Sequence, residues 1–574
     1  MGSLLHACPS MTPPTALPMS RRGALAAALA AVAWRPAFAM ADAGTGQAAA
    51  LHVLDRFAFG PAPGELERVT RMGASAWVAE QLQPDRLALP AWLADQLGTL
   101  RTPRQTQREL VQRYREAQRE AREAKKAETA SPDGTKAPDA AAGERRREAA
   151  LVAYESGEQR LLQALHSPRQ LQEVLVDFWF NHFNVFQGKG EDRVLVESYE
   201  REAIRPHVLG RFRAMLGATA KHPAMLFYLD NWLSVAPGFQ PRRKTGLFGG
   251  GGAAKAGGLN ENYARELMEL HTLGVDGGYT QQDVTELARI LTGWTMRPQQ
   301  PARRRFADAM DAPAGGHGDS IFLFDPARHD GGTKTWLGRR IAPDGQLEGE
   351  FALDVLAKHP STARHIAFKL ARRFVADDPP PALVDRLARR FLETDGDLRA
   401  MMQALADSPE FRDAAPTKFK TPYQYVLSAV RATGIVTTNV RPLMGQLAQL
   451  GQPLYGCQTP DGWHDTEADW LNPNAITQRV NFATALAAGR LPLQRVDDPD
   501  APAGNDGLKA MERQTERAMN GAQPVDGSTP PVDAATLLAT LGPAISDKTR
   551  RAVENAPPEL RAALVLGSPD FMRR

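Results

Sequence analysis

Residues 258–294 read GLNENYARELMELHTLGVDGGYTQQDVTELARILTGW and carry the clearest structural signal in the chain. Apolar residues recur three and four positions apart in this stretch, which is the spacing of one face of an α-helix. Thr280 is followed three positions later by Asp283, and this pair resembles a capping box at the start of a helix. Gly274 lies between the two periodic segments. The stretch therefore predicts two consecutive helices joined by a glycine-containing turn.

Other parts of the chain repeat this helical pattern, and no region alternates short strands with helices. The apolar residues keep a helical period in segments 171–186, 198–233, 350–433 and 475–488. Residues 320–324, Ser-Ile-Phe-Leu-Phe, have a β-like composition and indicate a small hairpin. We predict a mainly α fold, a multi-helix globular body with long loops and one small β-hairpin.

One face of the first helix in the 258–294 stretch gathers polar residues. At 100° per residue, Arg265, Glu266 and Glu269 lie close together, and they are candidate catalytic residues. His271 projects to the apolar side and joins them only if the helix ends before it. The structural alternative is a ladder of exposed ion pairs, because Glu261, Arg265 and Glu269 are spaced by four.

His182 lies in the apolar segment 178–183 and projects inward, as His271 does. Burial lowers the pKa of an inward histidine and keeps it neutral, the form that binds a metal or acts as a base. His182, His271 and Glu266 together would make a divalent metal site of ordinary composition. Their spacing matches no established metal motif, so a core histidine with ordinary hydrogen bonds is the alternative.

His329 and Asp330 form a further candidate pair, in a glycine-containing loop that leads to Lys334. A histidine beside a carboxylate can act as a general base, and Lys334 could hold an anion. We therefore count His329 and Asp330 among the candidate catalytic residues, with an ordinary polar turn as the alternative. Serine catalysis has little support, because the sequence contains no Gly-x-Ser-x-Gly motif.

Composition places the chain among globular proteins and excludes some functions. It has 574 residues, of which 43% are hydrophobic and 24% charged, and its net charge is +3. So small a net charge gives no electrostatic basis for nucleic-acid binding. We see no segment long enough to cross a membrane, so we do not expect an integral membrane protein. With only Cys8 and Cys457, a thiolate metal cluster is excluded.

The N-terminus has the features of an export signal. Arg21 and Arg22 precede an apolar run at 24–34, and the small residues Ala37 and Ala39 follow at the positions that a signal peptidase needs. The apolar run is too short to span a bilayer, as expected for a signal peptide. Paired arginines indicate the twin-arginine route, with an ordinary secretory signal as the alternative. We expect a periplasmic or secreted protein.

Shifts in composition divide the chain into six predicted segments. Residues 104–166 are rich in Arg, Glu, Gln and Ala, and indicate two charged helices joined by a disordered tip. The segments are an export signal at 1–41, an N-terminal helical segment at 42–103, a charged helical insert at 104–166, the main helical domain at 167–495, a disordered linker at 496–532 and C-terminal helices at 533–574.

Several short motifs carry a family resemblance. They are residues 52–60 (HVLDRFAFG), 178–183 (FWFNHF), 221–225 (KHPAM) with Asp230 and Asn231, 258–294, 329–338, Trp463, 470–472 and 481–483. With these motifs the chain resembles a bacterial family called domain of unknown function 1800. The resemblance implies a mostly helical, exported protein and carries over no catalytic residue, because the family has no settled activity. It also implies a partner, since genes of the family often accompany a second exported family that is similar to sulfatases.

Two hypotheses follow. The first is an exported enzyme, with metal-assisted hydrolysis as the preferred form and a metal-free carboxylate pair acting on a glycan as the other form. Its site would gather Glu266, Glu269, His182 and His329, assisted by Asp330 and Arg265. The second is a non-catalytic exported protein that binds or assembles with a sulfatase-like partner, as the charged helices at 104–166 indicate.

Overall fold

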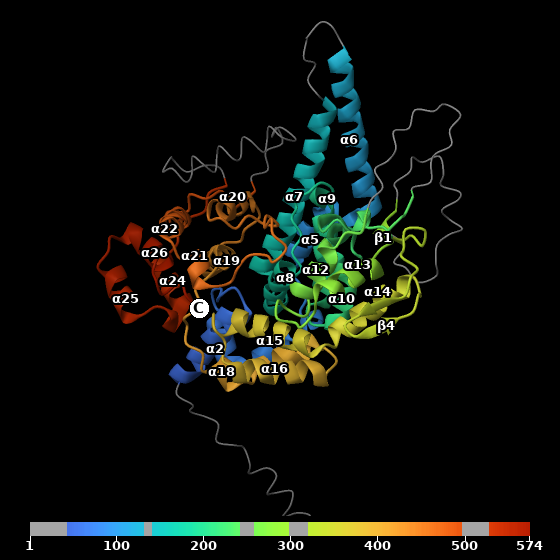
Figure 1. The fold of residues 1–574 in the computed structure, drawn as a ribbon. Coiled ribbons are helices and arrows are strands. Elements are labelled where there is room, and N and C mark those ends of the chain that lie inside the picture. The colour runs from blue at the N-terminus through green and yellow to red at the C-terminus, as the bar shows by residue number, and fades with distance from the viewer. Residues whose placement is uncertain (1–42, 131–139, 241–257, 298–319, 496–526) are drawn as a thin grey trace, which may run out of the picture. The chain divides into compact units, whose positions relative to one another are not determined.

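Helices dominate the structure, a computed structural model that describes residues 43–130, 140–240, 258–297, 320–495 and 527–574 (Figure 1). The described part contains 24 α-helices, is 61% helical, and has two small antiparallel sheets of two strands each. The prediction of a mainly α fold is confirmed. By their internal contacts, residues 47–574 form one compact unit.

Some of the described helices are joined by short turns and others by long connections, such as those between Tyr228 and Asn262 and between Ile290 and Gln346. In chain order they are α2 Ala43–Phe57, α3 Glu65–Met72, α4 Ala74–Gln81, α5 Ala91–Thr99, α6 Gln107–Ala130, α7 Ala140–His166, α8 Gln170–His182, α9 Asp192–Ser198, α10 Phe212–Lys221, α11 Pro223–Tyr228, α12 Asn262–Glu269, α13 Gln281–Ile290, α14 Gln346–Ala357, α15 Pro360–Phe374, α16 Pro381–Glu393, α17 Leu398–Ala406, α18 Pro409–Arg412, α19 Pro422–Thr433, α20 Arg441–Gln449, α21 Glu467–Trp470, α22 Pro473–Ala487, α24 Ala534–Leu541, α25 Asp547–Glu554 and α26 Pro558–Leu566.

Two helices are buried on nearly every side and form the centre of the core. Most residues of α8 and almost all of α19 are buried, because both sequences are apolar around most of the helix. Helix α7 packs against both of them. Helix α8, which covers most of the apolar segment 171–186 and ends at His182, is thus a central element of the fold.

The 258–294 stretch folds as its sequence predicts. Thr280 and Asp283 form the expected capping box of α13, in which the Thr280 hydroxyl accepts a hydrogen bond from the Asp283 amide and the carboxylate accepts one from the Thr280 amide. Gly274 adopts a φ of +83° in the turn after α12, a conformation that favours glycine.

The strands differ from the single hairpin that we predicted. The β-like residues form β2 Phe322–Phe324, which pairs with β1 Trp294–Met296, and a second sheet joins β3 Lys334–Trp336 to β4 Arg339–Ile341. Leu337 and Gly338 link β3 to β4 with φ values of +46° and +70°. Positive φ at both positions is typical of a type I′ hairpin turn, which favours Asn-Gly or Asp-Gly, so the leucine at position 337 gave no signal for this turn.

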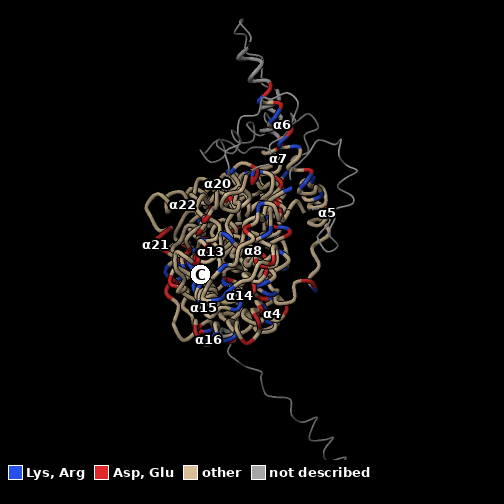
Figure 2. The backbone as a smooth tube through the Cα atoms, turned by 45° about the vertical axis from the view of Figure 1, so that its right-hand side comes forward, with Lys and Arg blue, Asp and Glu red and all other residues tan. Residues whose placement is uncertain are grey.

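Helices α6 and α7 pack side by side, and Figure 2 shows acidic and basic residues in close succession along α6. The predicted tip between them, the predicted export signal at 1–41 and most of the predicted linker at 496–532 lie outside the described residues. None of the described helices is long and apolar enough to cross a membrane.

Candidate functional site

The polar residues at the start of α12 hold the helix in place. The side-chain amide of Asn260 donates to the carbonyl of Asp230 at 3.2 Å, and that of Asn262 donates to the carbonyl of Leu229 at 3.4 Å. The Asn260 side-chain oxygen also accepts from the Asn262 amide at 2.9 Å. These asparagines therefore dock the helix N-terminus onto the turn that follows α11, which accounts for their presence without chemistry.

Arg265 and Glu261 connect α12 to α13. Arg265 donates to the side chain of Gln281 at 2.8 Å and lies 3.6 Å from the Glu261 carboxylate. Glu261 in turn accepts from Gln281 and from Thr285, each at 2.7 Å. The ion-pair ladder that we considered as an alternative thus exists between Glu261 and Arg265, and a catalytic role of Arg265 stays a prediction.

Glu266 and Glu269, one turn apart on α12, are both half-buried. Glu269 accepts a hydrogen bond from the Tyr279 hydroxyl at 3.3 Å. Burial raises the pKa of Glu266, and the negative charges of Glu269 and Asp461 raise this pKa further. The charge of Asp461, which is itself exposed, thus acts on Glu266, and we call Glu266, Glu269 and Asp461 the carboxylate cluster.

Asp461 reaches this cluster because its loop is fixed to the end of α8. The Asn181 side chain donates to the Trp463 carbonyl at 2.8 Å and accepts from the Trp463 amide at 2.7 Å. Gly462, which stands between Asp461 and Trp463 in the chain, has a φ of +76°. A Cβ at this position would lie 2.3 Å from the Asn181 carbonyl oxygen. Only glycine therefore allows the loop to approach α8 so closely.

The surroundings of Asp461 shift its pKa in the opposite direction to the pKa of Glu266. Burial raises the pKa of Asp461, but hydrogen bonds from Thr459 and His464 outweigh this effect and leave it below its ordinary value. His464 lies between two carboxylates, 3.2 Å from Asp461 and 3.2 Å from Asp469. These hydrogen bonds raise the pKa of His464. The cluster therefore pairs a carboxyl group that tends to keep its proton with one that tends to lose it.

Three histidines lie close together at the turn that ends α12, namely His182, His271 and His365. His182 contacts the His271 carbonyl at 3.1 Å through Nε2, and His365 contacts the Leu270 carbonyl at 3.2 Å in the same way. Because a carbonyl only accepts, each Nε2 carries the proton. The His182 ring centroid lies 6.2 Å from that of His271 and 6.1 Å from that of His365. The prediction that His182 faces the core is confirmed, since 1% of it is exposed.

All three rings are held in the neutral form. Burial lowers the pKa of His182 well below its ordinary value, that of His271 to about 3 and that of His365 to about 4. The positive charge of Lys369 on α15 lowers each of them further. His182 Nδ1 and His271 Nε2 are buried and have no hydrogen-bond partner among the described residues.

The proposed metal ligands do not come together as a set. Among the residues that the structure describes, no group of three or more His, Cys, Asp or Glu side chains could hold a metal ion. His182 already uses one ring nitrogen on the His271 carbonyl, while Glu266 has Asp461 and Glu269 as neighbours. A metal at His182, His271 and Glu266 stays a prediction without support from this geometry.

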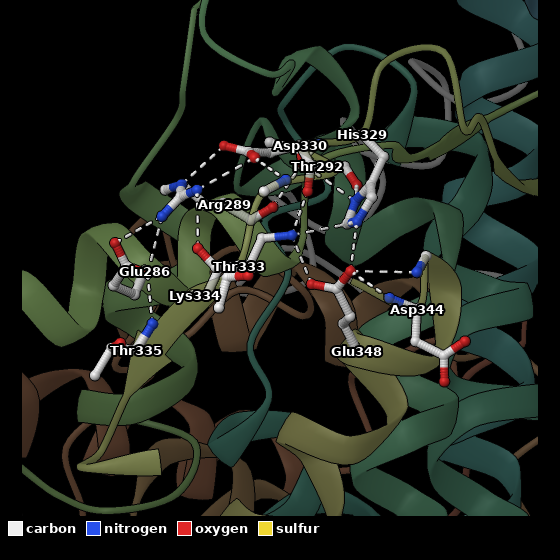
Figure 3. Close-up of polar contacts among 12 residues, drawn as sticks. Glu286, Arg289, Thr292, His329, Asp330, Thr333, Lys334, Thr335, Asp344 and Glu348 are labelled. Carbon is white, nitrogen blue, oxygen red and sulfur yellow. Dashed lines mark hydrogen bonds and ion pairs between the residues drawn. The ribbon is translucent and has the colours of Figure 1, made fainter. Parts of the chain in front are cut away.

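His329 belongs to a separate, buried network (Figure 3). Its Nδ1 lies 2.8 Å from the Thr292 carbonyl and its Nε2 lies 3.0 Å from the Glu348 carboxylate. The Lys334 amine contacts the other Glu348 oxygen at 2.6 Å, and neither side chain is exposed to solvent. Asp330 is paired with Arg289 at 2.7 Å.

The side chains of this network have hydrogen-bond or ion-pair partners, and these contacts join one loop to two helices. Burial raises the pKa of Glu348, but hydrogen bonds from Lys334, His329 and the Asp344 amide outweigh it and lower the pKa. The loop that carries His329 and Asp330 is thereby fixed to α13 and α14. This geometry favours a structural role, and a catalytic role of His329 and Asp330 stays a prediction that it does not support.

Sequence reasoning missed Asp461 of the carboxylate cluster, and also His365 and Lys369, which act on His182 and His271. Asp461 stands in a Pro-Asp-Gly-Trp loop that reads as a simple turn, and His365 and Lys369 stand on a helix whose apolar stripe dominated the pattern. The spacing of four between His365 and Lys369, which places both on one face of α15, was the available signal.

Comparison with known proteins gives a family and no activity. No curated protein and no solved structure matches this chain. Residues 52–573 match the family described as "Protein of unknown function (DUF1800)". Because this match covers most of the chain, the protein belongs to the DUF1800 family.

Proposed function

We propose that this protein is a glycoside hydrolase that uses Glu266 as general acid and Asp461 as base or nucleophile. The proposal is supported by the half-buried carboxylates of Glu266 and Glu269, which lie one turn apart on α12, together with the opposite directions of two pKa shifts, upward for Glu266 and downward for Asp461. Neighbouring titratable groups whose pKa values are pushed apart mark an acid and a base. Two carboxyl groups with these roles are the usual equipment for cleaving a glycosidic bond.

Each group has a defined task in the reaction. Protonated Glu266 gives its proton to the glycosidic oxygen as the bond to the anomeric carbon breaks. Ionised Asp461 either activates a water molecule or attacks the anomeric carbon itself. His464 keeps Asp461 ionised through its hydrogen bond, and Glu269 helps Glu266 to retain its proton.

The proposal includes a location outside the cytoplasm. The arginine pair and the apolar run before residue 42 support export. An exported hydrolase of this kind would act on glycans of the cell envelope or its surroundings.

Sugar release from glycans tests the proposal. The mature protein would be incubated with a panel of polysaccharides and p-nitrophenyl glycosides, and the new reducing ends or nitrophenolate would be measured. Glu266→Gln and Asp461→Asn should each lower the rate at least about 100-fold, the scale of a lost acid or base. Glu261→Gln is the matched control, because it makes the same change at the residue that precedes α12, where the side chain is engaged with α13. Wild-type protein that cleaves no glycoside would refute the proposal, as would full activity in both site variants.

The pH dependence gives a second test. Glu266 must be protonated, so the rate should fall as pH rises through its raised pKa, above the ordinary value of 4.5. Asp461 must be ionised, so the rate should fall as pH drops through its lowered pKa, below the ordinary value of 3.8. The two limbs belong to the coupled pair. A rate that rises steadily to alkaline pH would contradict the assignment of Glu266 as acid.

A second candidate function is binding to a sulfatase-like exported protein, without catalysis. The dense succession of opposite charges on α6 favours this alternative. This alternative would be supported if such a partner co-purifies with the wild-type protein but not with a variant that lacks α6 and α7. It also requires that Glu266→Gln leaves the cellular function of the protein unchanged.

A further inference from the structure

A small cavity lies where Arg574 meets α2, α15 and α19 (Figure 1). Its volume is about 10 Å³, enough for about one water molecule. Among the described residues that line it, four carry a positive charge and only Asp55 carries a carboxyl group. The cations are Arg56, Arg373, Lys420 and Arg574, and each is at most 5% exposed. The cavity therefore gathers positive charge in the interior of the protein.

Two of these cations are held by different kinds of partner. Arg373 is paired with the carboxylate of Asp177 at 2.9 Å. Arg56 donates to the main-chain oxygens of Phe374 and Val375 at 2.7 and 2.9 Å. These carbonyl groups satisfy its N–H donors but carry no net charge, so the positive charge of Arg56 finds no counter-charge in these contacts.

Lys420 and Arg574 have fewer partners still. The Lys420 amine lies 4.0 Å from the centre of the Phe571 ring, and it makes no hydrogen bond and no ion pair within 4 Å with any residue that the structure describes. Arg574 donates to the Arg373 carbonyl at 2.7 Å, while its buried Nε has no hydrogen-bond partner in the described part of the chain. Both side chains therefore keep unused N–H donors at the cavity.

The positive charge at this place exceeds the negative charge. Burial lowers the pKa of Arg574 to about 9 and that of Lys420 to about 8. Burial also raises the pKa of Asp55, and the opposing charges of Lys420 and Arg56 do not cancel this effect, so Asp55 tends to keep its proton. A second carboxylate at the main chain of Arg574, whose oxygen lies 3.5 Å from Arg56, would still leave an excess of cations. Such an excess is costly in the interior unless an anion offsets it.

The size of the cavity decides which anion fits. Sulfate and phosphate carry four oxygen atoms around a central atom, and a volume of about 10 Å³ does not hold them. A chloride ion is a single sphere slightly larger than a water molecule, and it accepts hydrogen bonds from N–H donors. A water molecule would fill the same space without bringing a charge.

We propose that this cavity binds one chloride ion, which Lys420 and Arg574 hold beside Arg56. The ion supplies negative charge that the cavity lacks, and it links the residues around 574 to α2 and α15. This site goes beyond the proposed glycoside hydrolysis, because its role is in the stability of the fold and not in bond cleavage.

Thermal unfolding in two sodium salts tests the proposal. The unfolding midpoint of the mature protein would be measured in sodium chloride and in sodium gluconate at equal ionic strength, because gluconate is too large for the cavity. Chloride at about 100 times its Kd should raise the midpoint of the wild type by about 2 °C, and the rise should grow with the logarithm of the chloride concentration.

Lys420→Met separates binding in the cavity from the general effects of the two anions on the protein surface. This variant should lose the chloride-dependent rise. Lys418→Met is the matched control, since Lys418 is equally buried but paired with Asp377 at 2.6 Å. Its loss should lower the midpoint in both salts and leave the chloride-dependent rise intact. A rise of the same size in wild type and Lys420→Met would overturn the proposal.

Crystals of the wild-type protein grown in sodium bromide give a result that does not depend on how a variant folds. Bromide occupies chloride sites and scatters X-rays anomalously, so one anomalous peak should lie within hydrogen-bond distance of Lys420 and Arg574. The absence of this peak would overturn the proposal. A peak without any chloride-dependent rise in the midpoint would mean an adventitious ion only, and it would also count against the site.

Discussion

Lys334 and Glu348 are joined by the most deeply buried ion pair of the His329 network. The amine and the carboxylate are 2.6 Å apart and neither side chain is exposed. Such a pair adds little net stability over apolar residues of the same size, but removal of one partner leaves an uncompensated charge in the core. Removal of one charge of this pair should therefore lower the stability of the protein, even when the substitution keeps the shape of the side chain.

Glu348→Gln tests this sensitivity. The substitution should lower the free energy of unfolding by about 3–5 kcal/mol, because Lys334 stays buried and loses its counter-charge. Its effect is measured as a fall in the thermal unfolding midpoint. Glu350→Gln, two residues along α14, is the control. Glu350 pairs with Arg213 and Lys221 at a partly exposed position, and its loss should cost at most about 1 kcal/mol. Equal effects of the two substitutions would contradict the proposed burial effect.

Acid should remove the contribution of Glu348. Its pKa is lower in the folded protein than the ordinary value of 4.5, so the folded state binds this proton less readily than the unfolded state. The stabilisation is present above pH 4.5 and is lost as pH falls through the lower, folded pKa. The difference in unfolding midpoint between wild type and Glu348→Gln should therefore shrink below that pH, and a constant difference would contradict this account.

At the scale of helices and strands, the sequence predicted where a helix lies and which of its residues share a face. It did not predict which helices pack against one another. Apolar spacing and the Thr280 capping box identified α12 and α13, because both signals act over a few residues. Residue spacing also brought Glu266 and Glu269 together. The effect of Asp461 on Glu266 could not be predicted, because nothing in a periodic pattern says which distant segments pack together.

Gly462 links two of these segments, and Gly462→Ala should separate them. An added Cβ would lie 2.3 Å from the Asn181 carbonyl oxygen, so the loop must move away from α8 and take Asp461 with it. Hydrogen exchange at 457–464 should increase, and glycoside cleavage should fall at least about tenfold, since small displacements of catalytic groups are costly.

Gly451→Ala separates this clash from backbone strain. Gly451 has a φ of +86°, close to that of Gly462, but a Cβ there would meet nothing within 4 Å. Its substitution should cost only the roughly 1–2 kcal/mol of a left-handed alanine, with hydrogen exchange at 457–464 unchanged. Similar exchange in both variants would mean that Gly462 matters for its backbone conformation alone.

For the whole molecule, α6 and α7 combine two environments along their length. Near the body, Leu110 and Val111 of α6 and Leu161 and Leu162 of α7 are fully buried, and α7 packs against α5, α8, α9, α19 and α20. Farther along, charged residues predominate in the sequence. Composition alone drew the boundary of the charged segment at 104–166, because charge density does not reveal which of its apolar residues reach the core.

Two deletions test how much of this segment the fold needs. Replacing residues 124–147 with about six Gly/Ser residues spans roughly 13 Å, enough to reconnect helices packed about 10 Å apart, and keeps the Arg115–Glu191 ion pair. This variant should unfold at the wild-type temperature, since it keeps every buried side chain that the structure describes in α6 and α7. Deletion of 104–166 removes four fully buried core residues, each worth about 2–5 kcal/mol, and should leave no cooperative unfolding transition. Cooperative unfolding of the larger deletion would mean that the segment is an independent insert.

If the smaller deletion cleaves glycans normally but no longer co-purifies with a sulfatase-like protein, catalysis and partner binding occupy different parts of the same chain.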